Sequence, residues 1–131
     1  MALQLLGCWR GWEGCYSGGA VQKTRRRKRT RQITEYVWAL GENARKRHYH
    51  ETERGEVRTF TVQLEIFVDD QWRPAVRYDS VHGFAHQDRY FLDGRSTKTE
   101  LYMDFTEALT FADEDIKENW TDYRDRFLRG E

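Results

Sequence analysis

The chain has 131 residues, enough for one domain. Charged residues make up 34% and hydrophobic residues 38% of it, but aromatic residues reach 15%, and a disordered chain would lack them. No apolar run reaches the roughly 18 residues of a membrane span, and two cysteines are too few for a disulfide scaffold. We therefore expect a cytoplasmic globular protein and exclude the membrane and disulfide-rich classes.

The net charge of zero conceals a strong polarity along the chain. Residues 1–57 contain 12 basic and 6 acidic side chains, whereas residues 58–131 contain 10 basic and 16 acidic ones. The basic first segment favours an anionic partner, although it can also bind the acidic residues of segment 58–131 in the same chain.

We interpret residues 1–44 as a leader with a basic arm, partly disordered or forming a short helix. Residues 1–22 show no clear period and are expected to be loosely ordered, or to reflect an over-long gene start. Seven of the nine residues 23–31 are basic, and such a block is expected to stay disordered until it meets phosphate. Apolar residues at helical spacing predict a short helix over 32–45. The expected nucleic-acid contacts are Arg25, Arg26, Arg27, Lys28 and Arg29.

Residues 45–131 are predicted to form one α+β domain. Residues 59–68 alternate between polar and apolar side chains, which indicates a strand with one buried face. Turn signals at residues 54–55, 69–71 and 93–94 predict antiparallel hairpins. Asp104 and Glu107 resemble a capping box that begins a long amphipathic helix. The predicted fold is an antiparallel sheet of about five strands with this C-terminal helix packed on one face. Its apolar stripe is Phe105, Leu109, Ala112, Ile116, Trp120, Tyr123 and Phe127.

Hairpin register predicts the neighbours of several polar residues. A two-residue turn at 54–55 and a three-residue turn at 69–71 fix which residues face each other across the strands. Both histidines of the first strand are then expected on the polar face of the sheet. His48, Thr61 and Asp79 are expected to form one row across three strands, with His50, Arg47 and Arg77 near or at its edge. The expected pairs are His48 with Thr61, His50 with Thr59, Asp79 with Thr61 and Arg77 with Gln63.

The segment RYDSVHGFAHQD, residues 77–88, concentrates the groups that acid–base chemistry requires. We expect His82 and His86 to act as acid and base near neutral pH, Asp79 to orient an imidazole, and Arg77 to bind phosphate. These are the parts of a ribonuclease that needs no metal or cofactor. Metal binding remains an alternative, because His82, His86 and Asp88 could ligate Zn²⁺ or Mn²⁺, and surface histidines without a role are another. The expected substrate-binding residues are His48, His50, Arg47, Arg54 and Asp88.

The same residues carry a family resemblance over about residues 45–131. Arg77-Tyr78-Asp79, His82-Gly83 and His86 with Asp88 resemble a small family of uncharacterised prokaryotic proteins with an RYD-x2-HG-x2-H-x-D motif. The Arg-Tyr-Asp strand and the following histidines are also loosely similar to TumE-type toxin–antitoxin proteins, although Ser80 stands where those proteins carry asparagine. This likeness implies a toxin-like protein that acts on RNA and has a cognate antitoxin as partner.

Two functions of different classes follow from these patterns. The first is a toxin-like, metal-independent ribonuclease that uses the histidine cluster; a metal-dependent nuclease on the same cluster is its variant. The second is a non-catalytic module that binds nucleic acid or protein, with no membrane involved in either case. The positions of the four histidines discriminate between them, because a catalytic cluster should converge within hydrogen-bond reach, and divergent histidines favour the binding module.

Overall fold

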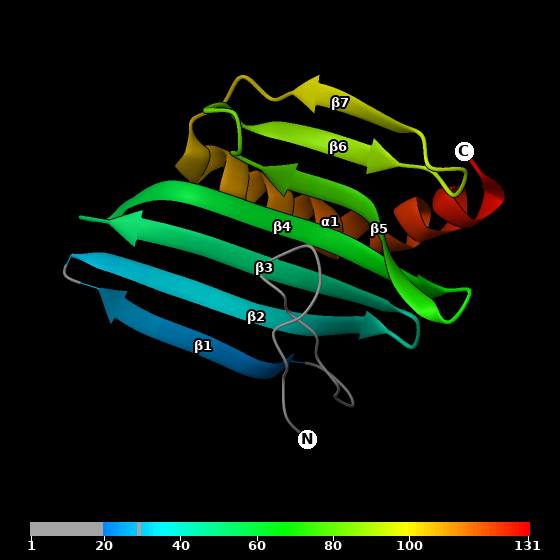
Figure 1. Ribbon diagram of the computed structural model, residues 1–131, viewed down its shortest axis with the longest axis horizontal. Coiled ribbons are helices and arrows are strands. Elements are labelled where there is room, and N and C mark those ends of the chain that lie inside the picture. The colour runs from blue at the N-terminus through cyan, green and yellow to red at the C-terminus, as the bar shows by residue number, and fades with distance from the viewer. Residues whose placement is uncertain (1–19, 29) are drawn as a thin grey trace.

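A computed structural model of the chain describes residues 20–28 and 30–131, with side chains from residue 30 onward. The described residues form one seven-stranded antiparallel sheet in chain order, and a long helix packs across one of its faces (Figure 1). The predicted α+β class is therefore confirmed, with seven strands in place of about five. The elements are β1 (Ala20–Lys28), β2 (Arg31–Gly41), β3 (Ala44–Glu53), β4 (Glu56–Val68), β5 (Gln71–Asp79), β6 (His86–Tyr90), β7 (Ser96–Glu100) and α1 (Phe105–Arg129).

The helix α1 begins and ends where its sequence signals lie. The Asp104 carboxylate accepts a hydrogen bond from the Glu107 amide at 2.8 Å, which satisfies a free donor of the first turn. Gly130 ends the helix with a φ of 79°, a left-handed conformation that glycine adopts without strain. No helix in the described part of the chain is long and apolar enough to cross a membrane. The predicted stripe faces the sheet: Leu109, Ala112, Ile116 and Phe127 are buried, and Phe105, Trp120 and Tyr123 pack against the core.

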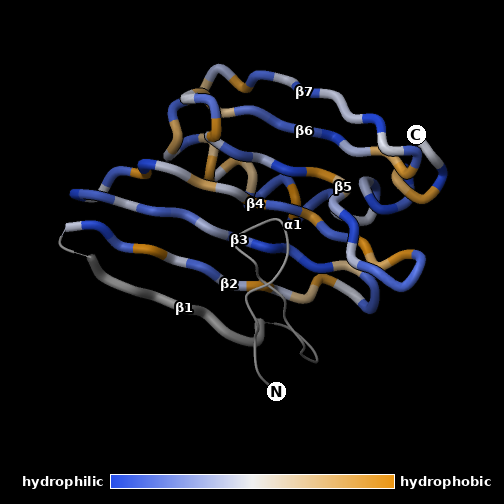
Figure 2. The backbone as a smooth tube through the Cα atoms, viewed as in Figure 1, coloured by the Kyte–Doolittle hydropathy of each residue, from blue (hydrophilic) through white to orange (hydrophobic). Residues whose placement is uncertain are grey.

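The core lies between α1 and the central strands β4 and β5. Phe60, Val62, Leu64 and Ile66 alternate along β4, point toward α1 and are almost completely buried. Burying four such side chains contributes a gross stabilisation of about 6–12 kcal/mol. Figure 2 shows apolar segments along α1 and the central strands, whereas β6 and β7 are mostly hydrophilic.

The first strands of the sheet lie where the sequence indicated a leader. The helix predicted over residues 32–45 is wrong: this segment forms β2 and the start of β3. Its Ile, Thr, Tyr, Val and Trp residues favour strands, and its apolar residues alternate onto two partly covered faces, which imitates helical spacing. The basic block was expected to be disordered, but residues 20–28 pair with β2 as the edge strand β1. Arg29 and the leader up to residue 19 lie outside the described residues.

A β-bulge changes the register between β3 and β4. Pairing is as predicted at Glu53 and Glu56, but it shifts by one residue between Glu51 and Thr52. His48 therefore pairs with Val62, and His50 pairs with Phe60, in place of Thr61 and Thr59. Since one residue of slip reverses the face of every side chain, both histidines lie on the face covered by α1, and the prediction of the polar face is wrong.

The register between β4 and β5 agrees with the prediction near the functional residues. Asp79 pairs with Thr61 and Arg77 pairs with Gln63. The turn before β5 has two residues, Asp69 and Asp70, where three were expected, and a second bulge near Pro74 restores the predicted pairing. These pairs place Asp79 and Arg77 on the face opposite α1, here called the open face.

Candidate functional site

The four histidines form two pairs on opposite faces of the sheet. His48 and His50 lie on the α1 face, with ring centroids 5.0 Å apart. His86 pairs with Asp79 across β5 and β6 on the open face, and His82 is exposed in the turn before β6. The His82 and His86 rings stack with their centroids 6.1 Å apart. The histidines therefore do not meet in the single cleft that the sequence suggested.

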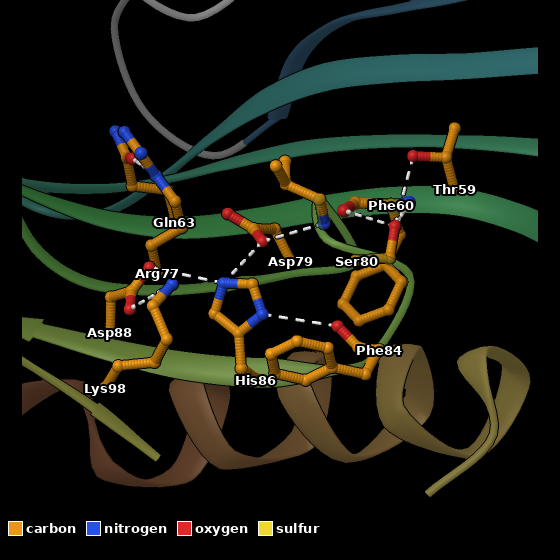
Figure 3. A network of polar contacts seen from close by, with 11 residues as sticks. Thr59, Phe60, Gln63, Arg77, Asp79, Ser80, Phe84, His86, Asp88 and Lys98 are labelled. Carbon is orange, nitrogen blue, oxygen red and sulfur yellow. Dashed lines mark hydrogen bonds and ion pairs between the residues drawn. The ribbon is translucent and has the colours of Figure 1, made fainter. Parts of the chain in front are cut away.

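Asp79, His86, Asp88 and Lys98 form a compact group at the end of β5, here called the strand-end cluster (Figure 3). The Nε2 atom of His86 lies 2.8 Å from Oδ1 of Asp79 and 3.5 Å from Oδ2 of Asp88. Lys98 on β7 contacts the other oxygen of Asp88 at 3.2 Å. His86 is 1% exposed, so the ring is enclosed by its partners.

Both ring nitrogens of His86 face acceptors. Nδ1 lies 3.2 Å from the Phe84 carbonyl oxygen, while Nε2 lies between the two carboxylates. A carbonyl and an ionised carboxylate only accept hydrogen bonds. Nε2 is therefore satisfied either by a ring proton or by a cation that it shares with the carboxylates. Because both nitrogens contact protein groups and the ring is 1% exposed, the geometry does not favour His86 as the base.

Two of the arginines predicted to bind substrate, Arg77 and Arg47, lie in a network of polar contacts along the open face. Nε of Arg77 donates to Gln63 at 2.6 Å, and Gln63 donates to Glu65 at 2.5 Å (Figure 3 shows the first two residues). Glu65 also pairs with Arg45 at 2.6 Å and with Arg47 at 3.1 Å, and both of these arginines are buried. Arg47 is thus a buried structural partner of Glu65. The predicted Arg54 is exposed in the β3–β4 turn, away from these polar contacts.

A second cluster on the α1 face joins β3 to the helix. Nδ1 of His48 lies 3.1 Å from Oδ1 of Asp113 on α1, and its Nε2 lies 2.7 Å from Nδ1 of His50. We call Asp113, His48 and His50 the histidine relay. Lys46 donates to the same Asp113 oxygen at 3.0 Å, and Tyr36 on β2 stacks on His48 with ring centroids 4.6 Å apart.

Electrostatics fix the charge at the inner end of the relay. Burial alone would raise the pKa of Asp113, but its hydrogen bonds and charge interactions with His48 and Lys46 outweigh burial and lower the pKa below its ordinary value. Burial, together with the charge of Asp113, raises the pKa of Tyr36 above its ordinary value. Asp113 therefore stays a carboxylate and Tyr36 a neutral phenol at neutral pH.

The carboxylate gives the relay a direction. Since Asp113 only accepts, Nδ1 of His48 carries a proton, and Nε2 of a neutral His48 then accepts from Nδ1 of His50. In that state Nε2 of a neutral His50 carries a lone pair. One further proton, taken up at Nε2 of His50, can be passed inward through Nδ1 to His48, where the Asp113 carboxylate stabilises the positive charge. His48 is 3% exposed, whereas His50 is half-buried.

Sequence reasoning missed Asp113 of the relay and its neighbours Lys46 and Tyr36. Asp113 is one of many charged residues of α1, but it follows Ala112 directly and borders the apolar stripe. A border position of this kind was the available signal. Tyr36 could not be found, because its strand β2 was interpreted as a helix. Lys46 lies on β3, and its contact with Asp113 depends on the docked helix.

The edge strand β1 brings basic residues into register with the relay. Arg25 pairs with Thr34, which in turn pairs with His50, and Lys23 stands in the row of His48. Neighbouring strands are about 4.8 Å apart, so the Cα atoms of Arg25 and His50 are separated by about 10 Å. The segment that carries five basic residues in nine therefore lies beside the relay and not on a detached arm.

The fold and these clusters define an α+β protein with a buried carboxylate–histidine pair on each face of its sheet. Residues 25–131 match a protein family described as a domain of unknown function, DUF7718, and the chain belongs to this family. No curated protein and no solved structure matches the chain. The likeness to TumE-type proteins stays a prediction.

Proposed function

We propose that the protein is a toxin-like ribonuclease that cleaves single-stranded RNA without a metal, with His50 as the general base. The observation that carries this proposal is the histidine relay beside the basic edge strand. The relay supplies an imidazole as proton acceptor, and the strand supplies cations for phosphate in the same rows of the sheet.

The chemistry needs one proton to move in and out of the relay. Nε2 of His50 takes the proton of a ribose 2′-hydroxyl, and the 2′-oxygen attacks the adjacent phosphorus. The bond from phosphorus to the 5′-oxygen breaks, and the same nitrogen returns the proton to that leaving oxygen. The products are a 2′,3′-cyclic phosphate and a free 5′-hydroxyl. Asp113 stabilises the positive charge that the histidine pair carries between the two steps.

The basic strand positions the substrate. The strand β1 carries five basic residues in nine, and its backbone pairing places Lys23 and Arg25 in the rows of the sheet that contain His48 and His50. Phosphates bound along this strand hold the RNA next to His50. Such contacts are independent of base sequence, and they make binding sensitive to salt.

A cognate antitoxin and a cytoplasmic site of action complete the proposal. Both rest on the likeness of the Arg-Tyr-Asp strand and its histidines to TumE-type proteins. RNA is the substrate partner, and the antitoxin would be the protein that holds the ribonuclease inactive.

A non-catalytic RNA-binding module is the second candidate. The separation of the histidines onto two faces favours it, because only one pair then lies near the basic strand. It predicts the same salt-dependent RNA binding without any cleavage.

The test is cleavage of a labelled single-stranded RNA by the pure full-length chain in buffer with EDTA. His50→Gln removes the proton acceptor and should slow cleavage by about 10²–10⁴-fold, the usual contribution of acid–base catalysis. His82→Gln is the matched control, since His82 is exposed on a turn outside the relay, and its rate should equal that of the wild type. Equal rates for wild type and His50→Gln would overturn the assignment, and binding without cleavage would favour the second candidate.

A further inference from the structure

We propose that Asp79, His86 and Asp88 of the strand-end cluster bind one divalent transition-metal ion. One ligand atom from each residue lies within 4.8 Å of the others. The three side chains converge from β5 and β6 on one point, as Figure 3 shows. This site is on the open face, away from the relay, and its existence does not depend on the proposed function.

The spacing of the ligand atoms fits an ion. Nitrogen and oxygen ligands lie about 2.1 Å from zinc, so two of them at bond angles of 90–110° are about 3.0–3.4 Å apart. The distances from Nε2 of His86 to the two aspartate oxygens are 2.8 and 3.5 Å, on either side of that range. Both nitrogen–oxygen distances are therefore close to those of a coordination shell, and all three ligand atoms lie within 4.8 Å of one another.

Each ligand is held by a partner of its own. Nδ1 of His86 lies 3.2 Å from the Phe84 carbonyl, a contact that directs Nε2 toward the carboxylates. The Val81 amide donates to Asp79 at 3.1 Å, and Lys98 holds the oxygen of Asp88 that does not face His86. Metal-binding histidines and carboxylates are commonly oriented by such outer contacts. These outer contacts hold the three ligand side chains in place, which distinguishes the group from acidic side chains that are close only by chance.

The buried position of the group also favours a cation. The three residues are 4%, 1% and 8% exposed, in chain order, so their charges are largely removed from water. Two buried carboxylates require positive charge nearby. Lys98 supplies one such charge to Asp88, and an ion bound to Nε2 of His86 would add another between the two carboxylates. One nitrogen and two carboxylate oxygens suit Zn²⁺ or Mn²⁺.

The experiment measures Zn²⁺ binding to the metal-stripped full chain by equilibrium dialysis with elemental analysis. The variant Cys8→Ser/Cys15→Ser serves as the background, because thiols outside the described residues also bind zinc. We expect one ion per chain in this background and a rise in melting temperature with added Zn²⁺.

Two variants decide whether the ion occupies this site. Asp88→Asn has nearly the same shape and removes one ligand charge, so binding of the stoichiometric ion and the thermal shift should both be lost. His50→Gln, on the other face, should keep both. The proposal is overturned if no saturable ion binds, if Asp88→Asn binds it as tightly as the background chain, or if His50→Gln is the variant that loses it. Asp79→Asn provides the same test should Asp88→Asn fail to fold.

Discussion

An alanine in place of Gly41 tests how α1 packs against the β2–β3 hairpin. Its Cβ would lie 2.8 Å from Cη2 of Trp120, whereas carbon atoms pack at about 3.5–4.0 Å, so the indole has to move by about 0.7 Å or more. Moving the ring costs energy, because it packs against the core and the Arg124 guanidinium lies 5.0 Å from its centroid. Overpacking costs about 1–3 kcal/mol, which exceeds the gain of about 0.5–1 kcal/mol from replacing a strand glycine. We expect Gly41→Ala to lower the free energy of unfolding by about 0.5–2 kcal/mol.

The assay is urea unfolding of four chains that form a double-mutant cycle: wild type, Gly41→Ala, Trp120→Leu and the combination. The smaller leucine removes the obstacle, so Gly41→Ala should be neutral or stabilising in the Trp120→Leu background. Glu42→Ala, in the exposed turn beside Gly41, is the control and should change stability by less than about 0.5 kcal/mol. An equal cost of Gly41→Ala in both backgrounds would refute the packing described here.

Three further predictions concern polar groups and the edge strand. Asp113→Asn should lower the free energy of unfolding most at neutral pH, because the pKa of Asp113 is lowered in the fold. The difference in unfolding free energy from wild type should fade as pH falls below about 4, and urea unfolding at several pH values measures it. Tyr78→Phe should cost about 1–3 kcal/mol in urea unfolding, because Tyr78 is fully buried and hydrogen-bonds both Asp115 and Gln87; a cost near zero would contradict this network. Neutralising the basic block should weaken RNA binding. The slope of the logarithm of the binding constant against the logarithm of the salt concentration should become shallower by about 0.7 per lost phosphate contact. An unchanged slope in titrations at several salt concentrations would show that the strand does not bind phosphate. The residues to replace are Arg25, Arg26, Arg27, Lys28 and Arg29.

Long periodic patterns and strong turns made most of the fold predictable. The stripe of α1 repeats over six turns, and its cap at Asp104 depends only on neighbouring residues. The alternation along β4 and the turns at Gly55 and Gly94, with φ of 80° and 92°, also depend on local sequence. Short-range rules of this kind predicted the class and the helix. The pairing of Asp79 with Thr61 was also predicted, but only because the shorter turn and the bulge near Pro74 offset each other.

The candidate site was less predictable because a single bulge decides it. Counting from the turn at Gly55 gives the correct pairs only as far as Thr52, and the shift beyond that point moves His48 and His50 to the other face. No local pattern marks where a strand accommodates an extra residue, and the shift places Phe60 on the face that packs against α1. The partnership of His48 with Asp113 spans 65 residues and required the docked helix to be known.

The most direct measurement uses a DNA strand that contains one ribonucleotide, incubated with the pure full-length chain in EDTA. Only the phosphodiester that follows the ribonucleotide has an adjacent 2′-hydroxyl. Our proposal predicts a single cut there, leaving a 2′,3′-cyclic phosphate, and loss of that cut in His50→Gln while the variant melts like the wild type. An uncut strand, or a cut made equally well by His50→Gln, would contradict the assignment of the relay as the active centre.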